Sequence, residues 1–334
     1  MVLRLPDKWV WDFWFARHEG RYHIFYLQAP RALGDPSRRH HSATIGHALS
    51  TDCRDWAVLP DAVHPGPPGS WDDLATWTGS TIEHRGRWYM AYTGISRAER
   101  GLVQRVGLAQ SDDLANWAKH PANPVIEADP RWYELLSQGR WVNQAWRDPW
   151  LFRLPGDHTF HVLITARARS GHPDAAGVLA HARSTDLVDW EVLPPLTSPG
   201  EFSQLEVPQL VVLNGRYVIL FCCLATDQSR ARSARTGARS QGGTFALSAA
   251  DFAGPYSPGD SPIALSEPLG VLYAGKLLDL ADGEWRFMAF RGDGDRDFLG
   301  ELTDPLPIEV SPAGDIVVRT EATPGERDDE LGPP

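Results

Sequence analysis

Three carboxylates stand in unusual surroundings in this sequence. Asp12 lies in Trp9-Val-Trp-Asp-Phe-Trp14, Asp148 in Trp146-Arg-Asp-Pro-Trp150, and Glu206 in Gln204-Leu-Glu-Val-Pro208. An isolated acid is most often a solvated side chain or a turn cap. Bulky apolar neighbours beside all three instead favour a shared and partly buried site.

A cluster of carboxylates is what the cleavage of an acetal requires. One carboxylate attacks or guides water at the anomeric carbon, a carboxylic acid protonates the leaving oxygen, and nearby negative charge stabilises the oxocarbenium-like transition state. Mutual repulsion raises the pKa of one acid enough to keep it a proton donor near neutrality. Metal binding is the competing use, but no His lies beside these acids at ligand spacing. We therefore expect neither a metal nor a cofactor.

Two sequence repeats predict the elements that position the carboxylates. A tight turn followed by alternating aromatic and aliphatic residues begins at Gly20, Gly86, Gly156, Gly215 and Gly283. In phase with it, a small-residue strand is followed by Ser-x-Asp at Ser50, Ser111 and Ser184, with a degenerate copy at Ser248. The period of roughly sixty to seventy residues accommodates about four short strands. The sequence therefore predicts an all-β fold, a single five-bladed β-propeller over residues 1–320, with an acidic tail at 321–334.

The repeat also predicts where the carboxylates meet. Counting back roughly eight to ten residues from each glycine turn reaches the start of an innermost strand, next to the central channel. Those positions hold Asp12, Gly79, Asp148, Glu206 and Tyr273. If the five positions are equivalent, the three acids converge on one funnel, within reach of one small ligand.

The composition favours a sugar-binding protein over a nucleic-acid-binding one. The 334 residues include 43 acids, 32 bases and 14 Trp, for a net charge of −11. Nucleic-acid binders usually carry a basic excess, whereas indole faces stack on sugar rings. Three cysteines form no disulfide framework, the N-terminal segment has no apolar run typical of a signal peptide, and no run of about twenty apolar residues occurs. We expect a cytoplasmic protein without nucleic-acid or membrane partners.

The loops that join second to third strands are predicted to share a face with the funnel, and they are basic. Residues 27–44, 94–104, 167–177 and 225–243 hold eleven Arg and four acids. Because the Arg fork pairs well with phosphate and carboxylate, one hypothesis is that this rim attracts an anionic sugar as substrate; a solvated rim or a subunit contact is the favoured alternative. The longest loop, residues 225–243, is rich in Ser, Arg and Gly and is expected to act as a mobile lid.

A set of short motifs, in this order, resembles landmarks of the five-bladed propeller glycoside hydrolases of families 32 and 68. They are Gly20-Arg-Tyr-His-Ile-Phe-Tyr26, Ile45-Gly-His-Ala-Leu-Ser50, Thr78-Gly-Ser80, Arg147-Asp-Pro149, Glu206-Val-Pro208 and Tyr273-Ala274. Val10-Trp-Asp-Phe-Trp14 looks more like the Val-Trp-Asp-Ser-Trp motif of the levansucrase group than the family 32 motif Asn-Asp-Pro-Asn-Gly. The C-terminal β-sandwich domain usual in family 32 is not expected.

The resemblance implies roles for individual residues. Asp12 is then the nucleophile of a retaining mechanism, Asp148 stabilises the transition state, and Glu206 is the acid/base. We expect seven further residues to bind substrate: Trp11, Trp14, Gln28, Trp77, Ser80, Arg147 and Tyr273. Arg147 pairs with Asp148, and the three tryptophans form the pocket walls. Gln28 sits one place later than the corresponding family 32 glutamine.

The expected substrates are small β-fructofuranosides such as sucrose or a short fructooligosaccharide, with fructosyl transfer where an acceptor sugar outcompetes water. Arabinofuranosidases and xylosidases of glycoside hydrolase family 43 share the propeller and similarly placed acids but invert, and they form the first alternative. A non-catalytic sugar-binding propeller is the second.

Overall fold

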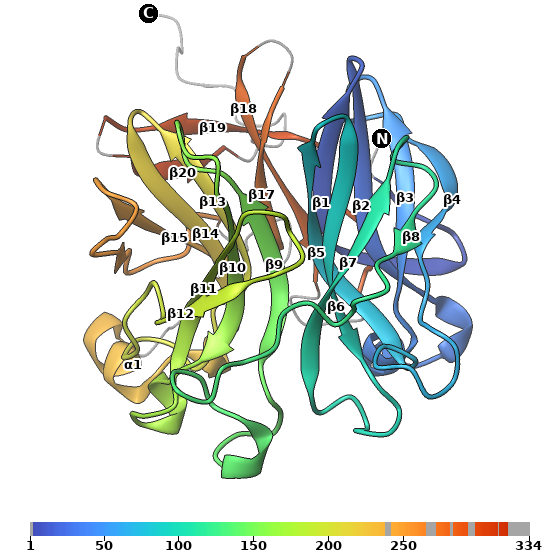
Figure 1. Cartoon of the computed structure of the whole chain (residues 1–334). Coiled ribbons are helices and arrows are strands. Elements are labelled where there is room, and N and C mark those ends of the chain that lie inside the picture. The colour runs from blue at the N-terminus through green and yellow to red at the C-terminus, as the bar shows by residue number, and fades with distance from the viewer. Residues whose placement is uncertain are drawn as a thin grey trace, which may run out of the picture.

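The described residues form five four-stranded antiparallel sheets, each built from consecutive strands in chain order. The computed structural model describes residues 3–237, 242–264, 272–280, 283–292, 298–312 and 314–319. The sheets stand around a common axis as the blades of a propeller (Figure 1). The predicted all-β, five-bladed β-propeller is therefore confirmed. The predicted acidic tail, residues 321–334, lies outside the described residues.

The strands divide evenly among the blades. The first blade contains β1 (Lys8–His18), β2 (Arg21–Pro30), β3 (Thr44–Ser50) and β4 (Ala57–Val63), and the second contains β5 (Ala75–His84), β6 (Arg87–Ile95), β7 (Gln104–Ser111) and β8 (Ala118–Lys119). The third contains β9 (Trp146–Phe152), β10 (Phe160–Arg167), β11 (Gly177–Ser184) and β12 (Glu191–Leu193). The fourth contains β13 (Glu206–Leu213), β14 (Arg216–Cys223), β15 (Gly243–Ala249) and β16 (Ser257–Pro258). The fifth contains β17 (Leu272–Asp279), β18 (Trp285–Arg291), β19 (Leu306–Val310) and β20 (Ile316–Val318).

Short helices occupy the connections between blades and strands. They are η1 (Arg31–Leu33), η2 (Pro36–Ser42), η3 (Leu136–Gln138), η4 (Pro173–Ala175), η5 (Ala225–Asp227) and α1 (Arg230–Thr236). Figure 1 shows α1 at the lower left of the propeller. Within the described ranges, no helix has the length and apolar composition needed to cross a bilayer.

The first sequence repeat marks the turn between the first and second strands of each blade. Its glycines, Gly20, Gly86, Gly156, Gly215 and Gly283, all have φ between 74° and 80°. Glycine enters this left-handed region without the steric cost of a Cβ atom. The same backbone requirement, met five times, explains why this repeat is visible in the sequence.

The second repeat marks the turn between the third and fourth strands. In the first blade Ser50 Oγ accepts a hydrogen bond from the Cys53 backbone N–H at 2.9 Å, and Asp52 Oδ1 accepts from Arg54 and Asp55 at 2.8 and 2.9 Å. The turns at Ser111 and Ser184 repeat this arrangement. These side chains act locally on their own backbone, so the motif is structural.

Each innermost strand has one residue more than the second strand with which it pairs. In the first blade Trp11 pairs with Leu27 and Phe13 with Tyr26, so that Asp12 is the extra residue. The register shifts in the same way between Trp77 and Gly79, Arg147 and Trp150, Glu206 and Gln209, and Tyr273 and Lys276. A β-bulge of this kind breaks the alternation of side chains and bends the strand.

The bulges correct the predicted equivalence of the blades. Asp12 follows Trp11, just as Asp148 follows Arg147, but Glu206 comes before its bulge and is equivalent to Arg147. The extra residue is present in all five blades, so it does not offset the blades from one another. The offset arose because the count back from the glycine varied between blades: a fixed count of eight from Gly20, Gly86, Gly156 and Gly215 reaches Asp12, Thr78, Asp148 and Val207.

The apolar cores lie mainly between neighbouring blades. Leu108 of the second blade shares a buried cluster with Val162 of the third, and Leu163 of the third shares another with Ile219 of the fourth. Each sheet therefore buries both faces, which fixes the angle at which its innermost strand meets the channel.

The first and fifth blades close the ring without exchanging a strand. The Val10 backbone N–H donates to the Gly300 carbonyl at 3.0 Å, and Leu302 N–H donates to the Leu3 carbonyl at 3.1 Å. Gly300 has φ 62°, and a Cβ atom there would lie 2.6 Å from Trp9 Cδ1 and 2.9 Å from Trp9 Cα. The closure therefore requires glycine for both its backbone conformation and its close approach.

We expect Gly300→Ala to lower the free energy of unfolding by about 2 to 4 kcal/mol, because it combines backbone strain with overlap against the Trp9 backbone. Gly20→Ala is the matched control, since Gly20 has φ 74° but nothing within 4 Å of an added Cβ. That change should cost about 1 kcal/mol. If urea unfolding shows an equal loss of unfolding free energy in both variants, the close approach of Gly300 to Trp9 is not important for stability.

Candidate active site

A cavity of 490 Å³ opens on the channel where the innermost strands begin, and all five blades line it. Consecutive residues face it from four bulges: Trp11 and Asp12, Trp77 and Thr78, Arg147 and Asp148, and Glu206 and Val207. Tyr273 contributes from the fifth blade. The structure thus brings together seven of the ten predicted site residues, including all three predicted catalytic acids.

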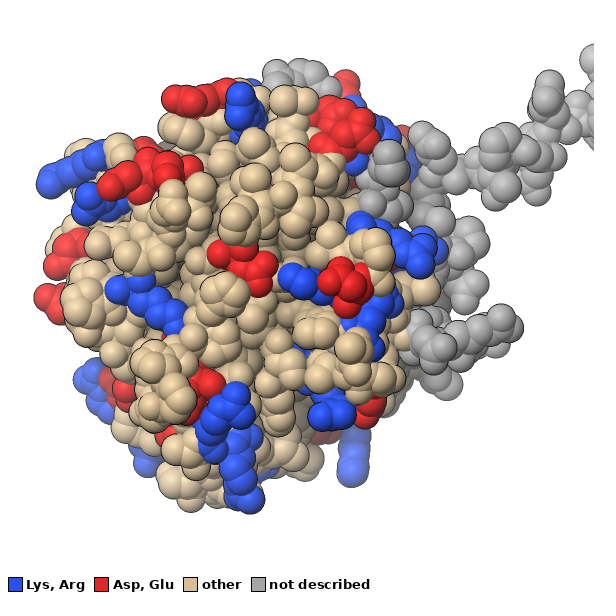
Figure 2. Space-filling model, turned by 90° about the vertical axis from the view of Figure 1, so that its right-hand side faces the viewer, with Lys and Arg blue, Asp and Glu red and all other residues tan. Residues whose placement is uncertain are grey.

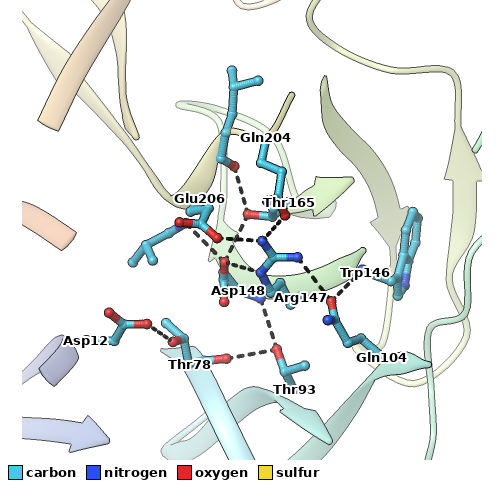
Figure 3. Close-up of polar contacts among 12 residues, drawn as sticks. Asp12, Thr78, Thr93, Gln104, Trp146, Arg147, Asp148, Thr165, Gln204 and Glu206 are labelled. Atoms are coloured by element: carbon cyan, nitrogen blue, oxygen red, sulfur yellow. Dashed lines mark hydrogen bonds and ion pairs between the residues drawn. The ribbon is translucent and has the colours of Figure 1, made fainter. Parts of the chain in front are cut away.

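Asp12 is half-buried on β1 and accepts a hydrogen bond from Thr78 Oγ1 at 2.5 Å (Figure 3). Burial raises the pKa of its carboxyl to about 7, and the charges of Asp148 and Glu206 add to this effect. The Thr78 hydrogen bond and the Lys276 ammonium act in the opposite direction. The ionisation of Asp12 near neutral pH therefore depends on two neighbouring acids, on Thr78 and on Lys276.

Asp148 is held more rigidly, with a residue exposure of 5% and φ 58°. Its Oδ2 accepts hydrogen bonds from Thr165 Oγ1 and the Val207 backbone N–H, both at 3.1 Å, and its own N–H donates to Thr93 Oγ1 at 2.9 Å (Figure 3). Burial raises the pKa of the carboxyl, while the Arg147 charge opposes the rise. These contacts fix the direction in which the carboxylate points.

Glu206 lies between a cation and a phenol. Arg147 Nη2 contacts Glu206 Oε1 at 2.6 Å, and Tyr273 donates its hydroxyl to Glu206 Oε2 at 2.5 Å. Arg147 is itself oriented by the side-chain carbonyls of Gln104, at 3.2 Å, and Gln204 (Figure 3). Tyr273 therefore lies in the cavity, with its hydroxyl hydrogen-bonded to Glu206.

Aromatic side chains form the wall beside Asp12, as predicted for Trp11 and Trp77. Trp77 Nε1 donates to the His40 backbone carbonyl at 2.6 Å, which ties β5 to η2. The His40 ring lies 6.0 Å from that of Trp11 and 6.1 Å from that of Trp77. Phe298 contacts the other side of Trp11, with ring centroids 6.4 Å apart. The wall thus combines strand residues with residues from two loops.

Three predicted substrate-binding residues lie elsewhere. Trp14 is 1% exposed and stacks on Phe25, because the side chains beyond the bulge pack between blades again. Ser80 Oγ accepts from the Leu151 backbone N–H at 2.7 Å, joining the second and third blades. Gln28 donates to Thr44 Oγ1 at 3.2 Å; its neighbour Leu27 lines the cavity, so alternation along β2 turns Gln28 away.

Sequence reasoning missed several residues of the cavity. Thr78, Gln104 and Gln204 contact the acids or Arg147, and His40 and Phe298 complete the aromatic wall. Thr78 stands next to Gly79, and a count of eight residues back from Gly86, the spacing of both aspartates from their glycines, would have found it. His40 and Phe298 come from loops without any periodic signal, and nothing in the sequence pattern points to them.

The arginine-rich loops place few of their charges at the cavity itself. Arg167 and Arg232 are buried and pair with Glu134 at 3.4 Å and Glu201 at 2.8 Å, acids supplied by other segments. Of the loop arginines within the described ranges, Arg39 is the one that lines the cavity, and Arg239 lies outside those ranges. Figure 2 shows basic and acidic side chains interspersed on one side of the molecule. The preference for an anionic substrate stays a prediction that these contacts do not test.

The expectation of a lid over residues 225–243 also needs correction. Its first part forms η5 and α1, and Arg232 of α1 donates to the Gly259 and Asp260 carbonyls at 2.7 and 2.9 Å. Residues 238–241 lie outside the described ranges. The described part of this loop is thus anchored to the fourth blade.

Over the described residues, no group of three or more His, Cys, Asp or Glu side chains is arranged to hold a metal ion.

Comparison with known proteins places this cavity in a family context. The chain is 30% identical over 197 residues to a cell wall β-fructofuranosidase of Pisum sativum, a match covering 58% of this chain and 32% of that protein. It is 31% identical over 182 residues to a sucrose:sucrose 1-fructosyltransferase of Festuca arundinacea, covering 52% of this chain and 24% of that one. The chain thus spans less than a third of either relative.

A solved structure of similar fold covers nearly the whole chain. The inulosucrase of Halalkalicoccus jeotgali bound to kestose superposes with a TM-score of 0.77 at 24% identity, over 96% of this chain and 92% of that one. Residues 12–255 match the model of the glycosyl hydrolases family 32 N-terminal domain. This match runs from Asp12 past Asp148 and Glu206, and on that basis the chain belongs to glycosyl hydrolase family 32.

Proposed function

We propose that this protein is a retaining glycoside hydrolase that cleaves small β-fructofuranosides such as sucrose and short fructooligosaccharides. The observation that carries the proposal is the floor of the cavity, where three carboxylates share one space but have different partners. Thr78 contacts Asp12, backbone and threonine donors hold Asp148, and Arg147 and Tyr273 hold Glu206. Three acids with three environments fit three separate tasks in acetal cleavage.

The proposed mechanism uses each carboxylate once. Asp12 attacks the anomeric carbon and forms a covalent glycosyl ester, while Glu206 donates its proton to the leaving oxygen. Asp148, fixed by its hydrogen bonds, offers negative charge to the oxocarbenium-like transition state. Glu206 then removes a proton from the incoming water, which releases the sugar from Asp12 with net retention. An acceptor hydroxyl in place of that water gives fructosyl transfer.

The named relatives support this substrate class over the alternatives. The pea and fescue relatives are named as a β-fructofuranosidase and a sucrose fructosyltransferase, and the inulosucrase was solved with kestose. An inverting arabinofuranosidase or xylosidase is disfavoured because the family match is to family 32. A purely sugar-binding propeller would have no need for a half-buried carboxyl with a pKa of about 7 beside two other acids.

We expect Asp12→Asn to lower kcat on sucrose by a factor of about 10³ or more, because the amide cannot form the glycosyl ester. Asp7→Asn is the control, since Asp7 is exposed and precedes β1. NMR of the first-formed product of the wild type should show β-fructofuranose. First-formed α-fructofuranose, or cleavage of aryl arabinofuranosides with no action on sucrose, would refute the proposal, and so would unchanged turnover in Asp12→Asn.

The fall of kcat/KM on the acid side of its pH profile, the acid limb, should depend on Thr78. Asp12 must be ionised to attack, so kcat/KM is expected to fall as the pH drops below about 7, the pKa of its carboxyl. Thr78→Val removes a hydrogen bond that favours the ionised form, and the limb should move up by about one pH unit. Thr81→Val is the control, because Thr81 lies on the same strand and donates to the Phe15 carbonyl. An unmoved limb in folded Thr78→Val would contradict this assignment.

We also propose a reducing compartment, the cytoplasm, as the location of the protein. The support is chemical: Cys53, Cys222 and Cys223 are free thiols, and all three are buried. Cell fractionation with antibodies against the native protein tests this, and recovery in a secreted or wall-bound fraction would overturn it.

A further inference from the structure

We propose that Lys276 is a positioning residue of this active site, whose buried ammonium lies beneath the carboxylate floor and holds the backbone that follows Glu206. The inference rests on the proposed function, because it assigns a task to a residue that the mechanism above does not use. Lys276 does not line the cavity, so it acts through the acids rather than on the sugar.

The surroundings of Lys276 are unusual for a lysine. The residue is 2% exposed at the bulge of β17, and it is one of three lysines in the sequence. Its Nζ donates to the Val207 carbonyl at 2.8 Å and the Pro208 carbonyl at 2.9 Å, and lies 4.9 Å from the centre of the Trp150 ring. A buried ammonium is costly unless its hydrogen bonds and charge are compensated, so this one is expected to have a purpose.

The charges that face Lys276 are those of the active site. Asp12 on β1 and Asp148 on β9 both favour its protonated form, and the nearby Cys222 thiol on β14 is uncharged because burial raises its pKa to about 12. Burial nevertheless lowers the pKa of the ammonium to about 8, so it is charged at neutral pH. That charge in turn lowers the pKa of Asp12. Lys276 is thus a fixed cation that favours the ionised nucleophile.

The hydrogen bonds of Lys276 also bear on the two other acids. Val207 directly follows Glu206 and has φ 51°. Its carbonyl accepts from Lys276, and its N–H donates to Asp148 Oδ2 at 3.1 Å. One residue in a strained conformation is therefore held on both sides, by the fifth blade and by the third. Releasing the Lys276 contact would loosen the bulge that aims Glu206 and orients Asp148.

Lys276→Met tests the charge with a side chain of similar length. We expect the acid limb of kcat/KM to move up by about one pH unit and kcat at the optimum to fall about 10- to 100-fold, with KM for sucrose within about threefold of wild type. Lys276→Arg retains the charge and should restore the position of the limb. Lys119→Met is the matched control, because Lys119 pairs with the buried Asp72 outside the cavity.

A second measurement reports on the buried ammonium without catalysis. Its pKa is about 8 in the folded protein against 10.5 for an ordinary lysine, so between these values the unfolded chain binds more protons. The unfolding free energy of the wild type should therefore rise relative to that of Lys276→Met from about pH 8 to pH 10.5. Parallel curves would contradict the lowered pKa of this ammonium and, with it, an apolar environment around Lys276.

The outcomes separate this inference from the proposed function. An acid limb that stays in place in folded Lys276→Met, beside an active wild type, overturns the positioning role alone. If the wild-type protein is inactive on every fructofuranoside, the proposed function is overturned. The pH dependence of the unfolding free energy still tests whether burial lowers the pKa of Lys276. If Lys276→Met does not fold, the Lys276→Arg variant tests the positioning role instead. Above pH 8 the wild-type lysine loses its proton whereas arginine stays charged, so the ratio of kcat/KM in Lys276→Arg to that in the wild type should increase. A ratio that is constant with pH would refute the role.

Discussion

One extra residue in each innermost strand governs how this propeller builds a site. In a regular strand, side chains alternate between faces, and of two neighbours only one can point into the channel. The bulges remove that restriction, so Arg147 and Asp148, or Trp11 and Asp12, face the same cavity. The backbone is strained in return, with φ 58° at Asp148 and 51° at Val207, at a cost of order 1 kcal/mol or more each.

Hydrogen bonds between blades hold the strained residues and orient the acids at the same time. Thr93 Oγ1 donates to the Thr78 carbonyl at 3.1 Å and accepts from the Asp148 N–H, while Thr165 Oγ1 lies 3.1 Å from Asp148 Oδ2 and 2.8 Å from the Leu205 carbonyl. This chain of contacts runs from the second blade to the fourth. The catalytic geometry and the packing of the blades are therefore maintained by the same side chains, and neither is independent of the other.

The sequence predicts the propeller well because its repeats encode local chemistry. A glycine at positive φ, or a serine and an aspartate that cap their own turn, needs only its immediate neighbours, so the pattern survives in each blade. The bulge carries no such signature, so the pattern does not reveal which two neighbouring residues face the channel together. The predicted equivalence was wrong by one place at Gly79, Glu206 and Tyr273, because the count back from the glycine turn was not held constant between blades. Partners from distant segments are equally invisible: Glu134 and Glu201 neutralise arginines that look free when loops are considered separately.

The near-symmetry of the blades explains how three acids coexist on one floor. The residues before the bulges are Trp11, Trp77, Arg147, Glu206 and Tyr273, and Asp12, Thr78 and Asp148 directly follow the first three of them. Around the ring, a donor therefore stands beside every carboxylate: the Thr78 hydroxyl at Asp12, the Arg147 guanidinium between Asp148 and Glu206, and the Tyr273 phenol beyond Glu206. Like charges this close would otherwise suppress one another's ionisation. Each blade contributes at most one acid to the cavity floor. The other positions beside the bulges therefore supply hydrogen-bond donors, and these donors give each acid a different environment.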